Sequence, residues 1–393
     1  MKPRTFDTIV IGGGLLGCAT TWMIAREGGR VLLVERDQIN QHASGSNAGS
    51  LHFQLEYRMI ERGVEAARKA AEAMPLHLEA AKLWSDLPDL CGQAIEVKQT
   101  GGLMIAENTH QVELLEKKTE IERSWGLDNR MIDRTEIDRI APYLSERVIA
   151  AAHCPTEGKA DARTAGPALA RAALQAGAQI QTRTEVTRLE RHGGRWHVVV
   201  TSAEGTMELS AESIVIAAGV WTTRLGQMMG AHLPTIPLAL MMTVTQRVPK
   251  LIPHLVQHAG GRLSLKQALD GNILIGGGWP ARLIRNADGE PNFEAKPELL
   301  ASSLSGNADM AIRVLPELSR IPVIRSWVGT TTVTSDQLPL VGPIPKQPGA
   351  FVATGGSAFT LGPSFAQVLA DLIAGRMPDT DLTAFAPDRY ERA

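Results

Sequence analysis

Features that would indicate a special partner or compartment are scarce in this sequence of 393 residues. Forty basic side chains stand against 42 acidic ones, so no excess of positive charge exists to bind a phosphate backbone, and we expect no nucleic-acid partner. The three cysteines, Cys18, Cys91 and Cys154, are far apart and form no CxxC pair. This spacing predicts reduced thiols and no metal or iron–sulfur site within the chain.

Long apolar runs are missing as well. No stretch approaches the roughly 18 consecutive apolar residues of a membrane-spanning helix, and the longest runs, such as residues 213–220, have the length of a strand. The regular pattern begins by Phe6, which leaves no room for a cleaved targeting segment before the first strand. We therefore expect a cytoplasmic protein without a transmembrane segment.

The N-terminal region carries the pattern of a βαβ unit. Residues 7–17 combine an apolar strand with a glycine-rich turn, residues 18–26 have the apolar spacing of a helix, and residues 30–36 form a second buried strand that ends in an acid. This order of elements is the context in which a GxGxxG motif binds a dinucleotide.

Each residue of the motif has a physical task. Gly12 permits the tight turn, Gly14 lets backbone N–H groups approach a pyrophosphate, and Gly17 lets the helix pack closely on the sheet. Glu35 follows Gly12 by 23 residues and can accept a hydrogen bond from a ribose hydroxyl. The unit therefore predicts a dinucleotide site, either for NAD or for FAD.

The rest of the chain mixes helical and strand patterns without an internal repeat or a low-complexity linker. Helical patterns occupy residues 58–86 (with a break or kink at Pro75), about 109–126, 164–177 and 363–374. Strand patterns occupy residues 178–182, 196–202, 207–211, 213–219, 272–278 and 350–356, with a hairpin turn at Glu204-Gly205. Two interleaved domains are expected.

Three further segments favour FAD over NAD. They are the small-residue loop 43–52, the pair 184–186 and 216–219, and the two C-terminal stretches 333–343 and 355–363. Together with the glycine motif, these segments resemble the D-amino-acid oxidase-like family of FAD-dependent oxidoreductases. This family includes glycine oxidase, sarcosine oxidase and the catalytic subunits of several heteromeric amine dehydrogenases. The resemblance covers nearly the whole chain.

The resemblance implies a fold that combines α/β and α+β regions. A Rossmann-like FAD-binding domain of residues 1–86, 148–224 and 326–393 would be interleaved with a mixed-sheet substrate domain of residues 87–147 and 225–325. The FAD should be non-covalent, because no cysteine after Cys154 is present for the flavin link of some relatives.

The same resemblance implies the residues around the cofactor. The small-residue loop would pass the pyrophosphate and the flavin, and the N-terminus of the last helix would stabilise negative charge at the flavin pyrimidine end. The implied cofactor-binding residues are Gly12, Gly14, Leu15, Leu16, Glu35, Arg36, Ser44, Ser46, Asn47, Ala48, Gly49, Ser50, Leu51, Val186, Ala218, Gly219, Trp221, Gly329, Gly356, Phe359, Thr360, Leu361 and Gly362.

The substrate side departs from the family pattern. Many members carry an arginine for the substrate carboxylate just after a W-x-G element, but here threonines follow Trp327-Val-Gly329. Arg325 and Lys266 are then the candidates for that role. His52, the titratable side chain of the small-residue loop, corresponds roughly to a flavin-facing basic residue of sarcosine-oxidase-like proteins and is the third catalytic candidate.

Within the family, the run from Asn47 to His52 looks most like the catalytic subunits of opine oxidases and D-hydroxyproline dehydrogenases. This likeness implies oxidation of the C–N bond of a small amino or imino acid, a secondary amine with a carboxylate such as an opine or hydroxyproline. It also implies a hetero-oligomer with a second flavin-binding subunit and an iron–sulfur subunit.

Three alternatives stay open at this point. One is a single-chain oxidase of the glycine or sarcosine type that makes hydrogen peroxide, and another is a flavin-bearing electron-relay subunit without a substrate site. An NAD-dependent dehydrogenase is the third, although it would leave the C-terminal glycine loop unexplained.

Overall fold

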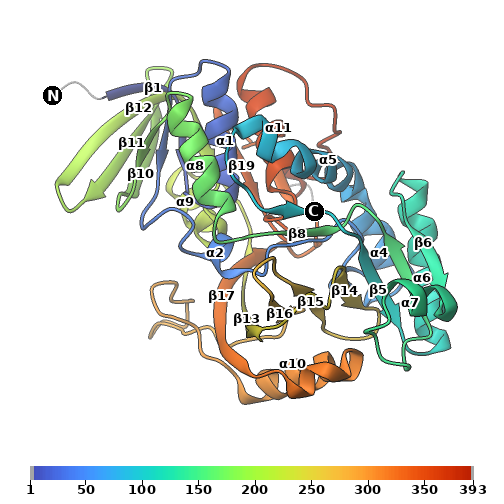
Figure 1. Cartoon of the computed structure of the whole chain (residues 1–393). Coiled ribbons are helices and arrows are strands. Elements are labelled where there is room, and N and C mark those ends of the chain that lie inside the picture. The colour runs from blue at the N-terminus through green and yellow to red at the C-terminus, as the bar shows by residue number, and fades with distance from the viewer. Residues whose placement is uncertain (1–3, 391–393) are drawn as a thin grey trace.

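The computed structural model describes residues 4–390, and its elements are arranged around two large β-sheets (Figure 1). The first sheet lies at the upper left of Figure 1 and the second along the lower half, with β8 (Gly158–Ala160) between them. Among the described residues, no helix combines the length and the apolar character needed to cross a membrane.

Parallel strands form the centre of the first sheet. They are β1 (Arg4–Ile11), β2 (Val31–Val34), β9 (Gln179–Gln181), β12 (Gly205–Ile216) and β19 (Ala350–Thr354). β1 pairs in parallel with β2 and with β12, β2 continues to β9, and β12 continues to β19. Their apolar side chains are buried on both faces, which explains why these segments read as continuous apolar runs.

Helices cover one face of this sheet, and an antiparallel extension covers the other. The helices are α1 (Leu15–Arg26), α8 (Ala165–Gln175) and α11 (Gly362–Ile373), which share one hydrophobic core. A second core on the opposite face includes residues of β10 (Glu185–His192), β11 (Arg195–Ser202) and α9 (Thr222–Met228). β18 (Leu340–Pro343) pairs with β19.

The segment predicted as one helix over residues 58–86 is broken into several pieces. These are α3 (Tyr57–Ile60), α4 (Val64–Ala70), a 3-10 turn (Ala71–Ala73) and α5 (Met74–Cys91). Gly63 separates the first two with a φ of +93°, a conformation that suits glycine. Pro75 lies in the first turn of α5, where its missing N–H costs no helical hydrogen bond.

The second sheet contains eight strands in the order β17, β13, β16, β15, β14, β5, β7 and β6. Their bounds are β17 (Val323–Val333), β13 (Ile236–Arg247), β16 (Asn272–Gly276), β15 (Ser264–Gln267), β14 (Leu255–His258), β5 (Gly102–Ala106), β7 (Ala150–Cys154) and β6 (Arg130–Asp133). Helix α10 (Ala301–Val314) packs on the face turned away from the first sheet (Figure 1). Helices α6 (Thr109–Ser124) and α7 (Arg134–Ile140) lie near β6.

A third, small sheet connects the two large ones. It consists of β3 (Ser50–Leu51), β8 and β4 (Val97–Lys98), with β8 in the middle. β3 belongs to the small-residue loop, which also contains the short helix α2 (Ala43–Ser46). This sheet therefore attaches the loop to a strand that leads directly out of the second sheet.

The predicted mixture of α/β and α+β architecture is confirmed, but details of the sequence interpretation are corrected. β7 and β17 pair within the second sheet, so the domain boundaries expected at residues 148 and 326 do not follow the sheets. The strands expected at 207–211 and 213–219 form one strand, β12. The hairpin at Glu204-Gly205 is present between β11 and β12.

Candidate active site

The two large sheets enclose a long cavity of about 1310 Å³. Sites for drug-sized ligands span roughly 300–1,000 Å³, so this one has room for a dinucleotide together with a small substrate. One end is lined by the glycine turn after β1, and the other by the small-residue loop, β13, β15 and the C-terminal glycine loop. The lining comes from loops, from β13 and β17, and from turns of several helices.

The glycines of the motif are required by close packing. A Cβ on Gly12, which has a φ of +114°, would overlap the carbonyl of Ala217. A Cβ on Gly17 would overlap the carbonyl of Gly12, so α1 approaches the turn as closely as a helix can. At the start of α1, the N–H of Leu15 donates to Ser44 Oγ at 3.0 Å. The loop after β2 is thereby connected to the positive end of the helix.

Glu35 lies at the end of β2 with its carboxylate facing the turn. It accepts hydrogen bonds from the N–H of Gly13 at 2.6 Å and of Asp37 at 2.7 Å, is 6% exposed, and lines the cavity. Beside it, the Arg36 guanidinium stacks over the Trp221 ring at 4.7 Å and pairs with Glu294 at 2.6 Å. Arg36 Nη1 is buried without a hydrogen-bond partner.

The small-residue loop is folded back on itself and fits against β17. Asn47 donates to the carbonyls of Ala43 and Ser44 and accepts from the N–H of Gly49 at 2.6 Å. Trp327 of β17 donates to the Ser46 carbonyl at 2.7 Å. A Cβ on Gly329 would lie 2.9 Å from Ser46 Cβ. The loop and the W-x-G element therefore pack so closely that both need small residues at this point.

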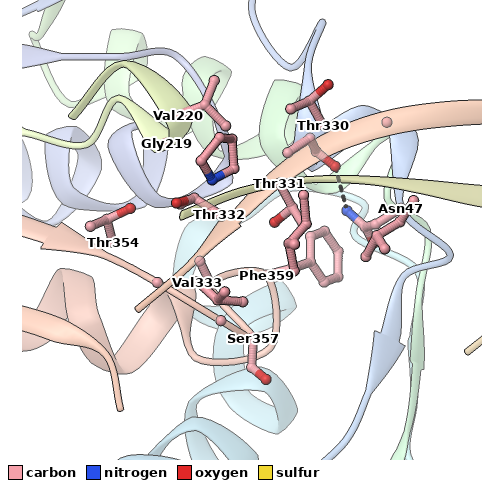
Figure 2. Close-up of a pocket in the computed structure, with 18 of the residues that line it drawn as sticks. Asn47, Gly219, Val220, Thr330, Thr331, Thr332, Val333, Thr354, Ser357 and Phe359 are labelled. Atoms are coloured by element: carbon pink, nitrogen blue, oxygen red, sulfur yellow. Dashed lines mark hydrogen bonds between the residues drawn. The ribbon is translucent and has the colours of Figure 1, made fainter. Parts of the chain in front are cut away.

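Figure 2 shows the same region from within the cavity. Asn47 of the loop, Thr330, Thr331 and Thr332 of β17, and Phe359 of the C-terminal loop lie around one space. Threonines therefore occupy the wall where the family pattern has the carboxylate-binding arginine.

Two of the three N–H donors expected from the C-terminal glycine loop form hydrogen bonds within the loop itself. Thr360 lines the cavity, and its hydroxyl donates to the Ser50 carbonyl at 3.2 Å. The N–H groups of Leu361 and Gly362, expected to face the flavin, instead donate to the carbonyls of Ser357 and Phe359 because the loop turns tightly at this point. Neither residue is among those that line the cavity.

The remaining cofactor candidates divide into two groups. The first group lines the cavity: Gly12, Gly14, Leu16, Ser44, Ser46, Ala48, Ser50, Val186, Ala218, Gly219, Trp221, Gly329, Gly356 and Phe359. The second group is buried behind the lining: Leu15, Gly49 and Leu51. Gly49 has a φ of +71°, and a Cβ there would overlap the Ala160 carbonyl, so its role is to let the loop approach β8.

His52 follows β3 and lines the end of the cavity formed by the small-residue loop and β15. Its Nε2 lies 3.0 Å from the Ser264 hydroxyl of β15, while its Nδ1 is buried without a partner. Burial lowers the pKa of His52 to about 4, and this effect outweighs the opposite influence of Glu56. The imidazole is therefore neutral at pH 7.

The other two catalytic candidates do not line the cavity. Lys266 is buried behind it on β15, where its ammonium donates to the Ala160 carbonyl at 3.1 Å. Burial lowers the pKa of Lys266 to about 7. Arg325 is exposed near the start of β17 and stacks on Trp327. The structure thus gives neither residue a contact with the cavity.

Sequence reasoning missed Arg58, which does line the cavity. Its guanidinium donates to Gln337 at 2.5 Å, to Ser357 at 2.8 Å and to Glu56 at 3.1 Å. A Cβ on Gly356 would lie 2.8 Å from Arg58 Nη2, which explains the glycine at that position. The signal available in the sequence was that Arg58 is the first cation after the small-residue loop.

These features define a protein with a βαβ dinucleotide site at one end of a cavity and a separate polar wall at the other. A model of the FAD dependent oxidoreductase family matches residues 7–372, and the chain belongs to this family. It is therefore an FAD-dependent, amino-acid-oxidase-like oxidoreductase, which confirms the resemblance, the cofactor and the enzyme class predicted from the sequence.

Curated relatives differ in length. The chain is 27% identical over 389 residues to glycine oxidase of Geobacillus kaustophilus (strain HTA426), covering 98% of this chain and 97% of the relative. It is 26% identical over 396 residues to one of the subunits of the opine oxidase of Rhizobium meliloti, covering 98% of both chains. It is 25% identical to mitochondrial sarcosine dehydrogenase of Mus musculus, of which it spans 42%.

The fold matches solved structures over the whole chain. The crystal structure of glycine oxidase from Geobacillus kaustophilus superposes with a TM-score of 0.84 and 24% identity, covering 98% of this chain and 99% of that one. This likeness confirms the fold.

The residues at the first end of the cavity fit FAD. Gly12 and Gly14 leave the turn without side chains, Glu35 offers carboxylate oxygens, and Arg36 has a buried donor without a partner. Among the described residues, Glu35, Asp37 and His42 converge closely enough to hold a metal ion. Their ligand atoms already have partners, because Glu35 accepts from two backbone N–H groups and His42 bonds to Asp37 at 2.8 Å.

Proposed function

We propose that this enzyme oxidises the C–N bond of a small secondary amine that carries a carboxylate, such as an opine or a hydroxyproline. The observation that carries the proposal is that a neutral imidazole and a half-buried guanidinium both line one end of the cavity. His52 and Arg58 both line this end, and the charge of Arg58 is close enough to influence the pKa of His52.

Arg58 is the cation best placed for the substrate carboxylate. Among the arginine and lysine side chains that line the cavity in the described region, Arg36 and Arg58 are half-buried and the others are exposed, and Arg36 lies beside Glu35 at the nucleotide end. The guanidinium of Arg58 has five N–H donors and uses three of them in the hydrogen bonds described above. It can therefore form a charge-assisted hydrogen bond to a carboxylate.

Apolar side chains in the cavity lining fit an amine with apolar carbon substituents. Leu240 and Met242 of β13 line the cavity beside Ser264. When bound, FAD supplies the acceptor for the hydride that leaves the carbon next to nitrogen. The neutral His52 ring, fixed by Ser264, lines this end of the cavity without placing a second positive charge beside the amine nitrogen.

We further propose that the chain is the catalytic subunit of a hetero-oligomer, with a second flavin-binding subunit and an iron–sulfur subunit. Similarity over 98% of both chains to a relative that is itself named as one subunit of an opine oxidase supports this. The three cysteines of this chain are separate buried thiols, so electrons that leave through an iron–sulfur centre require another chain. A cytoplasmic location agrees with the reduced thiols.

Similarity to glycine oxidase over a comparable length supports a second candidate, a single-chain oxidase that reduces oxygen directly. The two candidates differ in their electron acceptor. The purified chain alone should be reduced by substrate but reoxidise slowly in air if it works with partners, and it should produce hydrogen peroxide at full rate if it is an oxidase. Co-purification from the native host, followed by mass measurement of the complex, tests the partners directly.

The substrate proposal is tested by anaerobic bleaching of the bound flavin. We expect opines or cyclic imino acids to reduce the flavin faster than sarcosine, and sarcosine faster than glycine. Fastest reduction by glycine would overturn the secondary-amine proposal, and no reduction by any amine would favour an electron-relay subunit. The des-carboxy analogue of the best substrate serves as the control, because it should bind weakly if Arg58 holds a carboxylate.

A further inference from the structure

Two buried carboxylates hold three consecutive backbone N–H groups next to His52. Glu157 accepts from the N–H of Phe53 at 2.8 Å and of Gln54 at 2.9 Å, both through Oε1. Glu122 accepts from the N–H of Leu55 at 2.6 Å. Such N–H groups normally donate to backbone carbonyls of the same helix or of a neighbouring strand, whereas here side chains from two distant segments accept from them.

Both carboxylates belong to one buried network. The Gln54 side chain donates to Glu157 at 3.0 Å and accepts from Lys118 at 2.9 Å. Lys118 also pairs with Glu122 at 2.8 Å, and both side chains are 0% exposed. Asn129 donates to Glu122 as well. Burial of these ionic groups carries a large desolvation cost, which apolar residues of similar size would avoid.

The network lies between two parts of the cavity wall. Residues 53–55 are buried, whereas His52 on one side and Glu56 and Arg58 on the other line the cavity. Glu157 directly precedes β8, which pairs with β3 on the other side of His52. The space for the carboxylate comes from Gly102 of β5, because a Cβ there would overlap Glu157 Oε2.

We propose that Glu157 and Glu122, joined through Gln54 and Lys118, are positioning residues that fix His52 and Arg58 toward the substrate. Neither carboxylate lines the cavity, so they act through the backbone of residues 53–55. This inference rests on the proposed function for the roles of His52 and Arg58. Errors of about 1 Å in the position of such groups can reduce a rate by about 100-fold.

The pattern of donors and acceptors makes the proposal specific. In Glu157→Gln, the new Nε2 group would face the Gln54 Nε2 group, so two donors would meet. Gln54 cannot rotate its amide to relieve this without losing the hydrogen bonds from Lys118 and Asn129. The double exchange Glu157→Gln with Gln54→Glu restores every donor–acceptor pair and keeps the number of charges unchanged.

The test compares wild type, Glu157→Gln and the double exchange as FAD-loaded protein. We expect Glu157→Gln to retain FAD, to lower the limiting rate of anaerobic flavin reduction by about tenfold or more, and to weaken binding of acetate observed through the flavin spectrum. Hydrogen exchange of the amides of residues 53–55 should accelerate in the single variant. The double exchange should return all three properties to within about threefold of wild type.

Glu107→Gln is the matched control. The Glu107 side chain is also largely buried, but it pairs with His258 and with Arg313 of α10 on the far face of the second sheet. We expect it to lower thermal stability while leaving reduction and acetate binding unchanged. Equal kinetic losses in Glu107→Gln and Glu157→Gln, or faster exchange at residues 53–55 without a change in reduction, would overturn the positioning role. If no amine reduces the wild type, the proposed function fails, and hydrogen exchange and acetate binding still test the network.

Discussion

The two ends of the cavity are built in different ways. At the nucleotide end, Gly12, Gly17 and Glu35 lie within one βαβ unit, and the contacts are made mainly by the backbone. At the substrate end, His52 and Arg58 come from one segment and Ser264 from β15, and these residues are oriented by other side chains. A site made by the backbone of one local unit is visible in a sequence motif, whereas a site made by converging side chains is not.

The difference also concerns how each end tolerates change. Steric overlap at a glycine turn affects the packing of helix on sheet and hence the whole fold. Loss of a side chain at the substrate end removes one interaction and leaves the core intact. Mutations at the nucleotide end should therefore change cofactor retention, and mutations at the substrate end should change substrate binding and flavin reduction.

The largest effect is expected for Gly17→Ala. Its methyl group would overlap the Gly12 carbonyl, so α1 must move away from the turn and the FAD site should be lost. The ratio of flavin to protein absorbance after purification measures this. Gly28→Ala is the control, since its φ is +89° but no atom lies within 4 Å of the new Cβ. It should cost only about 1–2 kcal/mol of stability. Normal flavin content in Gly17→Ala would show that the nucleotide end is less constrained than proposed.

Arg58→Gln should affect the substrate end alone. A charge-assisted hydrogen bond contributes about 1.5–3 kcal/mol, so the Kd for a carboxylate substrate should rise by about 10- to 100-fold while FAD stays bound. Anaerobic titration of the flavin spectrum gives this Kd. Arg262→Gln, which changes an exposed cation on the same cavity, should have little effect. If both variants weaken binding equally, the carboxylate has no specific partner at Arg58.

Glu35→Ala should show the complementary behaviour, with weaker FAD retention and an unchanged substrate preference. The loss of one charge-assisted hydrogen bond to the ribose should raise the Kd for FAD by about tenfold or more. Dialysis or ultrafiltration of the holoprotein measures it. Glu27→Ala changes an acid just after α1 that pairs with Arg376 outside the cavity, and it should retain FAD like the wild type. Unchanged retention in Glu35→Ala would remove that residue from the site.

The smallest effect is expected for acidification of the wild type. Burial lowers the pKa of His52 to about 4, so its protonation should add no inflection to flavin reduction near pH 6.5, where an exposed histidine titrates. Burial also raises the pKa of Glu157 to about 7, so an inflection from that carboxyl should be the same in wild type and in His52→Gln. Between pH 6.5 and 4 the unfolded chain binds a proton that the folded His52 does not. The stability that the neutral, buried His52 contributes to the folded state is therefore complete above pH 6.5 and is lost as the pH falls toward 4. A rate that falls by half near pH 6.5 in the wild type, but not in His52→Gln, would show that His52 is solvated.

The buried polar network illustrates where sequence reasoning failed. The apolar spacing of the helix at residues 109–126 places Trp125 on its apolar side, yet Trp125 is 43% exposed. Lys118 and Glu122 face inward instead, because Gln54 and the backbone of Leu55 provide partners for their charges. Such partners belong to segments more than 60 residues away, and no periodicity within the helix reports them.

The sequence by itself determined the class of this protein, its FAD cofactor and the parallel strands of the βαβ unit. Those features depend on short-range patterns: apolar strands, glycines that only a tight turn requires, and an acid at a set distance. Tertiary structure alone decided the substrate end. It buried Lys266 behind the cavity, left Arg325 exposed, and brought Arg58 to Ser357 and Gln337, which are about 300 residues away along the chain. Whether a side chain is buried, paired or open to a ligand depends on which distant segments pack against it, and that is set by the fold and not by local sequence.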